Sequence, residues 1–290
     1  MNLPFVLGAA QFGLKYGITN TSGCIKPNEI HDIVSCCLDE GIYSFDSALA
    51  YGKSLDMLAA SIPAAIKKDI DIINKFSLKD DLKVVYAKLN NYLASSGFKK
   101  FYALLIHDPQ EIHNIDTRQL LDFFYQIKSQ NIVNKIGVSV YDIDQLGMIL
   151  DKFPIDLVQC PINLFDQSFL SDKVIDAIKE RNIELHARSL FLQGVLLANT
   201  LPKKLSGLGD LWGKYQLLLK ELHMTPIEFI MSWARDKSLV DKWVVGVTSH
   251  NELKEILYNY KAAKALSKNH SYNNLSDPTN PLINPSNWRV

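Results

Sequence analysis

Seven short segments of this chain have the apolar pattern of a β-strand, and a single polar residue lies at the carboxyl end of each. These residues are Asp46, Lys75, His107, Ser139, Gln159, Arg188 and Thr248. An apolar strand that ends in one polar side chain, repeated along the chain, is typical of a parallel α/β barrel, whose active site lies at the carboxyl ends of the strands. The pattern therefore constrains both the fold and the place where chemistry would occur.

Eight candidate strands alternate with helical segments. The strands begin near Phe5, Tyr43, Asp71, Phe101, Val133, Asp156, Ile183 and Lys242. Apolar residues recur at helical spacing over 28–40, 82–95, 117–129, 142–151, 171–181 and 251–263. This alternation implies parallel strands joined by right-handed crossovers, and a spacing of roughly 30 residues favours closure into a barrel. We expect an α/β fold, a single (β/α)8 TIM barrel that forms one domain over residues 1–290.

Two segments depart from this regular alternation. After the seventh strand the chain passes through Gln193-Gly194, a flexible stretch over 203–209 and an extra helix over 211–222. A long loop at this end of a barrel is expected to act as a lid over the ligand. Residues 267–290 are expected to form an irregular tail that runs extended over the surface, because three residue pairs there disfavour helix. The pairs are Asp277-Pro278, Asn280-Pro281 and Asn284-Pro285.

The charge balance narrows the choice of partners. Lysine plus arginine and aspartate plus glutamate each number 31 in the 290 residues, so the formal net charge is zero. A neutral chain has no long-range field with which to hold nucleic acid or an anionic membrane. No uncharged apolar stretch approaches the roughly 18 residues of a membrane span, and the start Met1-Asn2-Leu3-Pro4 does not look like a signal peptide. We expect a cytoplasmic monomer or small homo-oligomer that acts on a small molecule.

Cysteine and histidine usage gives no sign of a metal site. The cysteines have no C-x-x-C spacing and are expected to be buried thiols in a reducing compartment. The histidines outside the seven strand ends lack metal-ligand spacing, so we expect no metal. The four cysteines are Cys24, Cys36, Cys37 and Cys160.

The string Asp46-Ser47-Ala48-Leu49-Ala50-Tyr51-Gly52 is the most informative local feature. An aspartate at a strand end, five residues before a tyrosine, presents a carboxylate and a phenol to one pocket. Lys75 and His107, from the next two strand ends, would face the same space. A nearby ammonium should lower the pKa of Tyr51 from its usual value of about 10, and Asp46 would hold that ammonium in place. His107 could hydrogen-bond and orient a carbonyl oxygen.

This set of residues suits the reduction of a carbonyl group. A hydride must arrive on the carbonyl carbon, and the phenol of Tyr51 could donate the proton that the oxygen needs. None of the four side chains is a hydride donor, so a cofactor must supply the hydride.

Short segments around these residues occur together in one order along the chain. They are Leu7-Gly8 with Phe12-Gly13, Phe45-Asp46-Ser47-Ala48, Tyr51-Gly52-Lys53-Ser54, Asn74-Lys75-Phe76, Leu105-Ile106-His107-Asp108-Pro109, Ile136-Gly137-Val138-Ser139, Val158-Gln159-Cys160-Pro161-Ile162-Asn163, Ala187-Arg188-Ser189-Leu190, Gln193-Gly194-Val195-Leu196 and Val244-Val245-Gly246-Val247-Thr248. Each segment is weak alone, but their shared order at strand ends is specific. The chain thereby resembles the aldo-keto reductase family over nearly its whole length.

The resemblance implies roles for particular residues. Asp46, Tyr51, Lys75 and His107 match the family's catalytic tetrad, with Tyr51 as the proton donor. Eight further residues are expected to bind the cofactor, in three groups. Ser139, Gln159 and the neighbouring Asn163 match residues that hydrogen-bond the nicotinamide carboxamide. Arg188, beside Ser189, falls where an aromatic residue usually stacks on the nicotinamide. Gly246, Thr248 and Lys254 fall near the family's phosphate-binding positions. The resemblance implies NADPH, with NADH as the alternative, and no metal.

Several residues depart from the family pattern. Val247, Thr248 and Leu253 stand where the family often has lysine or arginine for the 2′-phosphate of NADPH, which leaves His250 and Lys254 as the nearby cations. A phosphate dianion is harder to fix without a bidentate arginine. Thr248 and the start of the last helix could still accept a phosphate. The sequence therefore leaves the choice between NADPH and NADH open.

We expect the protein to reduce an aldehyde or ketone, such as a sugar-derived carbonyl, to the alcohol. One alternative is a non-catalytic NADP-binding sensor or regulatory subunit on the same fold, which would not need a complete tetrad. Another is a lyase or epimerase in which Lys75 forms a Schiff base, a role that a neighbouring Asp46 would oppose. Trp212 and Tyr215, on the extra helix, are further candidates for substrate contact.

Overall fold

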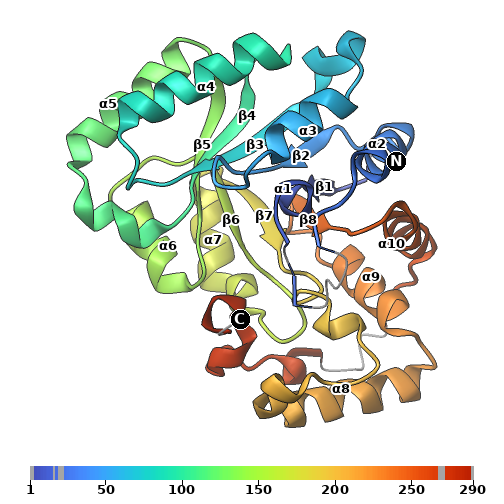
Figure 1. Cartoon of the computed structure of the whole chain (residues 1–290). Helices are drawn as coiled ribbons and strands as arrows, with labels where there is room; N and C mark the ends of the chain where they lie inside the picture. The colour runs from blue at the N-terminus through green and yellow to red at the C-terminus, as the bar shows by residue number, and fades with distance from the viewer. Residues whose placement is uncertain (1–2, 16, 19–22, 267–271, 289–290) are drawn as a thin grey trace.

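Eight parallel strands close into a barrel in this computed structural model, which describes residues 3–15, 17–18, 23–266 and 272–288 (Figure 1). Neighbouring strands pair in sequence order, and β8 pairs with β1 to complete the ring. Each predicted strand start lies within one residue of an observed one, and the (β/α)8 fold is confirmed. The strands are β1 Phe5–Gly8, β2 Ser44–Asp46, β3 Asp71–Phe76, β4 Phe101–Ile106, β5 Val133–Ser139, β6 Leu157–Pro161, β7 Glu184–Arg188 and β8 Lys242–Gly246.

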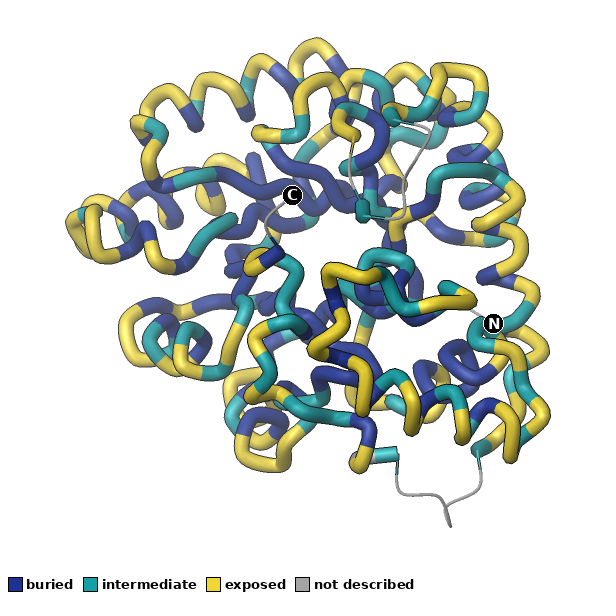
Figure 2. Tube along the Cα trace, turned by 60° about the horizontal axis from the view of Figure 1, so that its bottom comes forward, coloured by how far each residue is buried: buried dark blue, intermediate teal, exposed yellow. Residues whose placement is uncertain are grey.

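Helices surround the barrel, and each predicted helical range corresponds to an observed helix. Side-chain caps fix several of their starts; Thr225, for example, forms a capping box with Glu228. Buried positions face the strands and exposed positions face outward (Figure 2). Within the described residues, no helix is both long and apolar enough to cross a membrane. The helices are α1 Ala10–Gly13, α2 Pro27–Asp39, α3 Ser54–Ser61, α4 Leu82–Ser96, α5 Thr117–Ser129, α6 Ile143–Leu150, α7 Asp172–Glu180, α8 Gly209–Leu222, α9 Pro226–Asp236 and α10 His250–Ala262.

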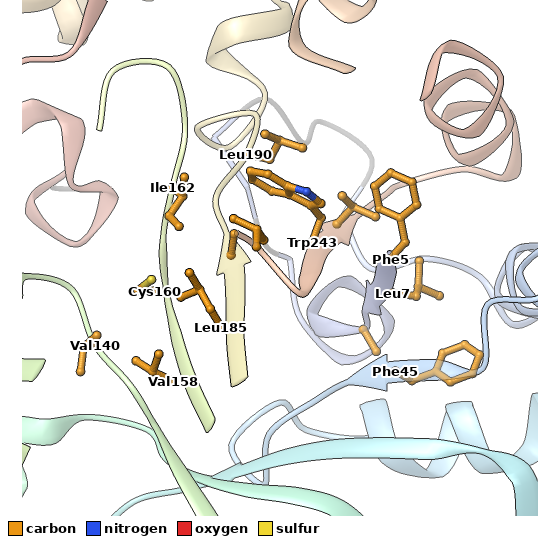
Figure 3. Packing of buried hydrophobic residues seen from close by; sticks show 14 of the residues in the cluster. Phe5, Leu7, Phe45, Val140, Val158, Cys160, Ile162, Leu185, Leu190 and Trp243 are labelled. Carbon is orange, nitrogen blue, oxygen red and sulfur yellow. The ribbon is translucent and has the colours of Figure 1, made fainter. Parts of the chain in front are cut away.

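Side-chain alternation along the strands separates two apolar cores. Successive side chains of a strand point to opposite faces, so Phe5 and Leu7 pack outward against the helices (Figure 3) while Val6 points into the barrel. The inner core also contains Ile73 and Leu157. The next inward positions on their strands are Lys75 and Gln159. The polar strand ends therefore lie directly above the apolar filling of the barrel.

Two segments expected to be irregular contain local structure. Residues Lys203–Leu208, predicted as part of a flexible stretch, form 3-10 turns, η5, with a kink at Leu205, and bury Leu205 and Leu208. The tail is irregular as predicted, but the prediction that it runs extended was wrong for its described part, which contains three 3-10 turns, η6 Tyr272–Leu275, η7 Pro281–Ile283 and η8 Pro285–Asn287. In the last two turns an asparagine side chain accepts a backbone N–H two residues later, so the Asn-Pro pairs start turns. The rest of the predicted tail, 267–271 and 289–290, lies outside the described residues.

The cysteines are only partly as predicted. Cys36, Cys37 and Cys160 are buried, and burial raises the pKa of the Cys37 and Cys160 thiols, which keeps them unreactive. The predicted burial of Cys24 was wrong, because this residue is exposed in the segment between α1 and α2.

A charged network fills the opposite, amino-terminal end of the barrel. Glu184 on β7 pairs with Lys135 on β5 and accepts hydrogen bonds from Tyr102 at 2.6 Å and from the His186 ring at 2.9 Å. Burial alone would raise the pKa of Glu184, but the hydrogen bonds and charges of His186, Lys135 and Tyr102 together lower it to about 2. The network ties three strands together at the end of the barrel away from the predicted site.

Glu184→Gln should therefore destabilise the fold without altering the chemistry. The carboxylate's contribution is fully present above the unfolded-state pKa of 4.5 and is lost as the pH falls toward 2. We expect the free energy of unfolding at pH 7, measured by urea titration, to fall by about 3 kcal/mol. The control Glu221→Gln removes an exposed carboxylate of α8 and should leave stability within about 0.5 kcal/mol. Equal stabilities for the two variants would contradict the assignment.

Candidate active site

A cavity of about 800 Å³ opens at the carboxyl ends of the strands. It begins at the inner core of the barrel and extends past β8 to the start of α10, where Glu252, Glu255 and Ile256 line it. This is the position and size expected of a barrel active site. Ten of the twelve predicted site residues line it: Asp46, Tyr51, Lys75, His107, Ser139, Gln159, Arg188, Ser189, Gly246 and Thr248.

A buried ion pair lies at the base of this cavity. The Lys75 ammonium pairs with one carboxylate oxygen of Asp46 and also donates to the Ser47 carbonyl at 3.1 Å. The Gln159 amide donates to the second carboxylate oxygen of Asp46 at 2.8 Å. Both oxygens of the buried carboxylate are thus satisfied, as a buried charge requires. Gln159, predicted to bind the cofactor, is seen here to hold Asp46 in place.

Tyr51 and His107 complete the group around the ammonium. The Lys75 Nζ lies 5.3 Å from the centroid of the Tyr51 ring, and the His107 ring meets that ring edge-on at 5.8 Å. The predicted lowering of the Tyr51 pKa was wrong: burial and the Asp46 carboxylate raise it, against a smaller opposing effect of Arg188. The physical reason is chiefly burial, which disfavours the charged phenolate, with the Asp46 carboxylate adding to it. The phenol is therefore held in its protonated form.

The loop that carries Tyr51 is fixed from both sides. The Leu49 N–H donates to the Lys75 carbonyl at 2.9 Å, which attaches the loop to β3. On the other side, the Ser54 hydroxyl donates to the Ala9 carbonyl at 2.6 Å. Gly52 has a φ of 56°, a conformation that favours glycine. The turn at Tyr51-Gly52 packs directly on Gly13, where an added Cβ would lie 1.9 Å from the Tyr51 carbonyl oxygen.

Gly13→Ala is expected to displace Tyr51 and reduce turnover by at least about tenfold, because a shift of about 1 Å at a reacting group can cost 100-fold. Steady-state rates, with a thermal melt to measure folding, provide the test. Gly147→Ala is the matched control, since an added Cβ there meets no atom within 4 Å. Unchanged kcat in Gly13→Ala would show that the contact does not position the phenol.

His107 is neutral in this environment. Burial and the Lys75 ammonium lower its pKa from 6.5 to about 4, against a smaller opposing effect of Asp46. A neutral imidazole can donate one hydrogen bond to a carbonyl oxygen without itself transferring a proton.

The neutral state of His107 predicts a pH-dependent stability. Between pH 6.5 and about 4 the unfolded chain binds a proton at this residue that the folded chain does not. The free energy of unfolding therefore decreases as the pH is lowered through that window. We expect a loss of up to about 3 kcal/mol in the free energy of unfolding, absent from His107→Gln. NMR titration should show no protonation of the folded-state imidazole above pH 5; protonation near 6.5 would contradict the assignment.

Arg188 is anchored beside this group. Its guanidinium donates to the Val140 carbonyl at 3.0 Å and to the Ser189 hydroxyl at 3.3 Å, and lies over the Tyr141 ring at 4.2 Å. No carboxylate of the described residues forms an ion pair with Arg188. The following loop lines the cavity, from Leu190 to Asn199, in the position predicted for a lid.

Two predicted cofactor residues do not line the cavity. Asn163 accepts the Phe165 and Asp166 N–H groups, so its carbonyl oxygen stabilises a turn after β6. Lys254 lies on the part of α10 that faces α2, where its charge acts on the Cys36 thiol. Asn163 was predicted from its place in a motif and Lys254 as a nearby cation, and a position in the sequence does not fix what a side chain contacts.

The suggested substrate contacts on α8 are also not found. Tyr215 is fully buried and donates to the Leu196 carbonyl at 2.9 Å, and Trp212 packs against it. Neither side chain lines the cavity. α8 instead packs against the loop after β7 and supports it.

Several cavity residues were missed by the sequence analysis, among them Gln11, Tyr141, Glu252 and Glu255. Gln11 packs so closely on Gly246 that an added Cβ there would lie 2.9 Å from its amide nitrogen. For Glu252 a signal existed, because it stands three residues after Ser249, the cap of α10. Nothing in the sequence singles out the other three from ordinary surface or packing residues.

Comparison with protein families shows to which family the chain belongs. A family model described as the aldo/keto reductase family matches residues 4–270. The chain belongs to the aldo-keto reductase family. It is therefore an oxidoreductase of the class that reduces carbonyl compounds with a nicotinamide cofactor, as the sequence resemblance implied.

Solved aldo-keto reductases share the fold at low sequence identity. The Bacillus halodurans aldo-keto reductase, solved in its holo form, is 13% identical, with a TM-score of 0.72 over 95% of this chain and 92% of that one. The glycerol dehydrogenase of Gluconobacter oxydans is 16% identical, with a TM-score of 0.69 over 91% and 88%. A thermostable aldo-keto reductase solved with the inhibitor epalrestat is 18% identical, with a TM-score of 0.69 over 92% of each chain. No match was found among curated proteins.

The described residues contain no group of three or more histidine, cysteine, aspartate or glutamate side chains arranged to hold a metal ion.

Proposed function

We propose that this aldo-keto reductase uses NADH or NADPH to reduce an aldehyde or ketone to the alcohol, with Tyr51 as the proton donor. The observation that carries the proposal is the meeting of four side chains in one cavity: the Asp46–Lys75 ion pair lies beneath the Tyr51 phenol, and the His107 ring lies beside it. A carboxylate, an ammonium, a phenol and a neutral imidazole are the groups that proton delivery to a carbonyl oxygen requires.

The cavity fits a dinucleotide together with a small carbonyl compound. Ser139 and Gln159 offer hydroxyl and amide groups at the barrel mouth, where a carboxamide would be held. Gly8 and Gly246 pair in register on β1 and β8 and add no side chains of their own to the cavity wall. When bound, the cofactor supplies the hydride that none of these side chains can provide.

The chain's own residues account for the proton. Because burial keeps Tyr51 protonated, the phenol holds a proton ready for the developing alkoxide. An alkoxide is about as basic as hydroxide and much more basic than a phenolate, so the proton transfer is downhill even from a weakly acidic phenol. Lys75 beneath the ring would stabilise the phenolate that remains, and His107 would orient the carbonyl oxygen through a hydrogen bond.

The cavity wall favours a small polar substrate. Hydroxyl and amide side chains line it around the tetrad and on the loop after β7, among them Ser139, Gln193 and Asn199. Side chains of this kind hydrogen-bond substrate hydroxyl groups. We therefore propose a polyhydroxylated carbonyl compound, such as one derived from a sugar.

Tyr51→Phe is the direct test of this function. The variant keeps the ring but loses the proton, so we expect kcat to fall by 100-fold or more while cofactor binding is retained. Binding would be followed by the quenching of tryptophan fluorescence, and turnover by absorbance at the nicotinamide band over a panel of aldehydes and ketones. Tyr43→Phe, a half-exposed tyrosine away from the cavity, is the control.

Undiminished carbonyl reduction by Tyr51→Phe would remove the proton-donor assignment. Saturable cofactor binding without turnover of any carbonyl by the wild-type protein would favour the sensor function. Trapping of a substrate on Lys75 by borohydride would favour the Schiff-base alternative.

A further inference from the structure

The cavity ends at a group of carboxylates on and around the start of α10. We propose that these groups make the enzyme specific for NADH over NADPH, with Glu252 and Glu255 facing the adenosine ribose. The inference rests on the proposed function. It concerns the end of the site away from the tetrad, where the sequence left the choice of cofactor open.

The direction of the cofactor follows from the shape of the cavity. The hydride must reach the same carbonyl that receives the proton of Tyr51, so the nicotinamide has to lie at the tetrad. From there the cavity continues past Gly246 and Thr248 to Glu252 and Glu255. The adenosine half of a dinucleotide therefore lies against the first turns of α10.

Charge along the cavity changes sign between its two ends. The lysine and arginine side chains that line it, Lys75 and Arg188, lie at the tetrad. Glu252 and Glu255 line the other end, one helical turn apart on the same face of α10. Lys254 does not line the cavity, and its charge acts on Cys36 of α2. A 2′-phosphate dianion would meet two carboxylates and no lysine or arginine among the described lining residues.

Two backbone N–H groups at and just before the start of α10, those of Thr248 and His250, already donate to carboxylates. Glu252 accepts the Thr248 N–H at 2.6 Å and the Thr248 hydroxyl at 2.8 Å. Glu29, from α2, accepts the His250 N–H. A helix start commonly binds phosphate through such N–H groups and its dipole. Here carboxylates of the protein already accept two of these N–H groups, so a phosphate bound to them would have to displace a bonded anion of the protein.

The same carboxylates suit a ribose with both hydroxyls unmodified. A 2′-hydroxyl or 3′-hydroxyl donates to a carboxylate in a short, charge-assisted hydrogen bond. A phosphate on the 2′ oxygen removes that donor and adds repulsion. These carboxylates therefore strengthen the binding of NADH and weaken the binding of NADPH. An acidic residue at the ribose discriminates in the same way in dinucleotide-binding sites of other folds.

Calorimetric titration of the full chain with NAD⁺ and NADP⁺ tests the inference without relying on turnover. We expect NAD⁺ to bind at least tenfold more tightly at low ionic strength, and the ratio to shrink as salt screens the carboxylates. Glu255→Arg should tighten NADP⁺ binding at least tenfold and weaken NAD⁺ binding, because it replaces repulsion with a phosphate partner. Glu255 is exposed, so the change should not affect folding.

Glu180→Arg is the matched control, because it makes the same charge change on α7, outside the cavity, and should leave both affinities unchanged. NADP⁺ binding as tight as or tighter than NAD⁺ in the wild-type protein would overturn the inference, as would a Glu255→Arg variant with the wild-type ratio of affinities. Binding of neither dinucleotide would instead overturn the proposed function, and the inference with it.

Discussion

The buried pair between Asp46 and Lys75 is the interaction on which the site depends. Each charge is costly to bury alone, and each is compensated by the other and by neutral donors and acceptors of neighbouring strands. The pair joins β2 and β3, and through Gln159 it reaches β6 across the barrel. A change at any one of the three residues would leave a buried polar group unsatisfied. The need to pair these buried charges thus fixes the positions of the side chains beneath Tyr51.

Most of the fold and most of the site could be predicted from the sequence. The strand ends were predictable because one inward position per strand changes from apolar to polar, as from Ile73 to Lys75, and this change is visible in a single sequence. The irregular segments were not predictable in the same way. The Asn284-Pro285 pair is compatible with an extended chain or a turn, and only the packing of Trp288 nearby selects the turn.

The errors at the site share a physical cause. Motifs fix which residue occupies a position, but not what its side chain meets. Lys254 and Glu255 are neighbours on α10, yet a helix turns about 100° per residue, and only the second lines the cavity. For Tyr51, the sequence indicated that a cation lies nearby but gave no measure of how deeply the phenol is buried beside Asp46, so the direction of the pKa shift was mistaken.

The last strand completes the ring by pairing with the first, and Glu29 on α2 bonds the start of α10 across 221 positions of sequence. During synthesis, every shorter nascent chain therefore leaves β1 and the most recent strand as two unpaired borders, each able to template association with other chains. The barrel cannot close until β8 has been made. Such long-range pairing slows folding. The functional pocket can therefore first form when β8 joins β1, rather than when any single βα unit folds.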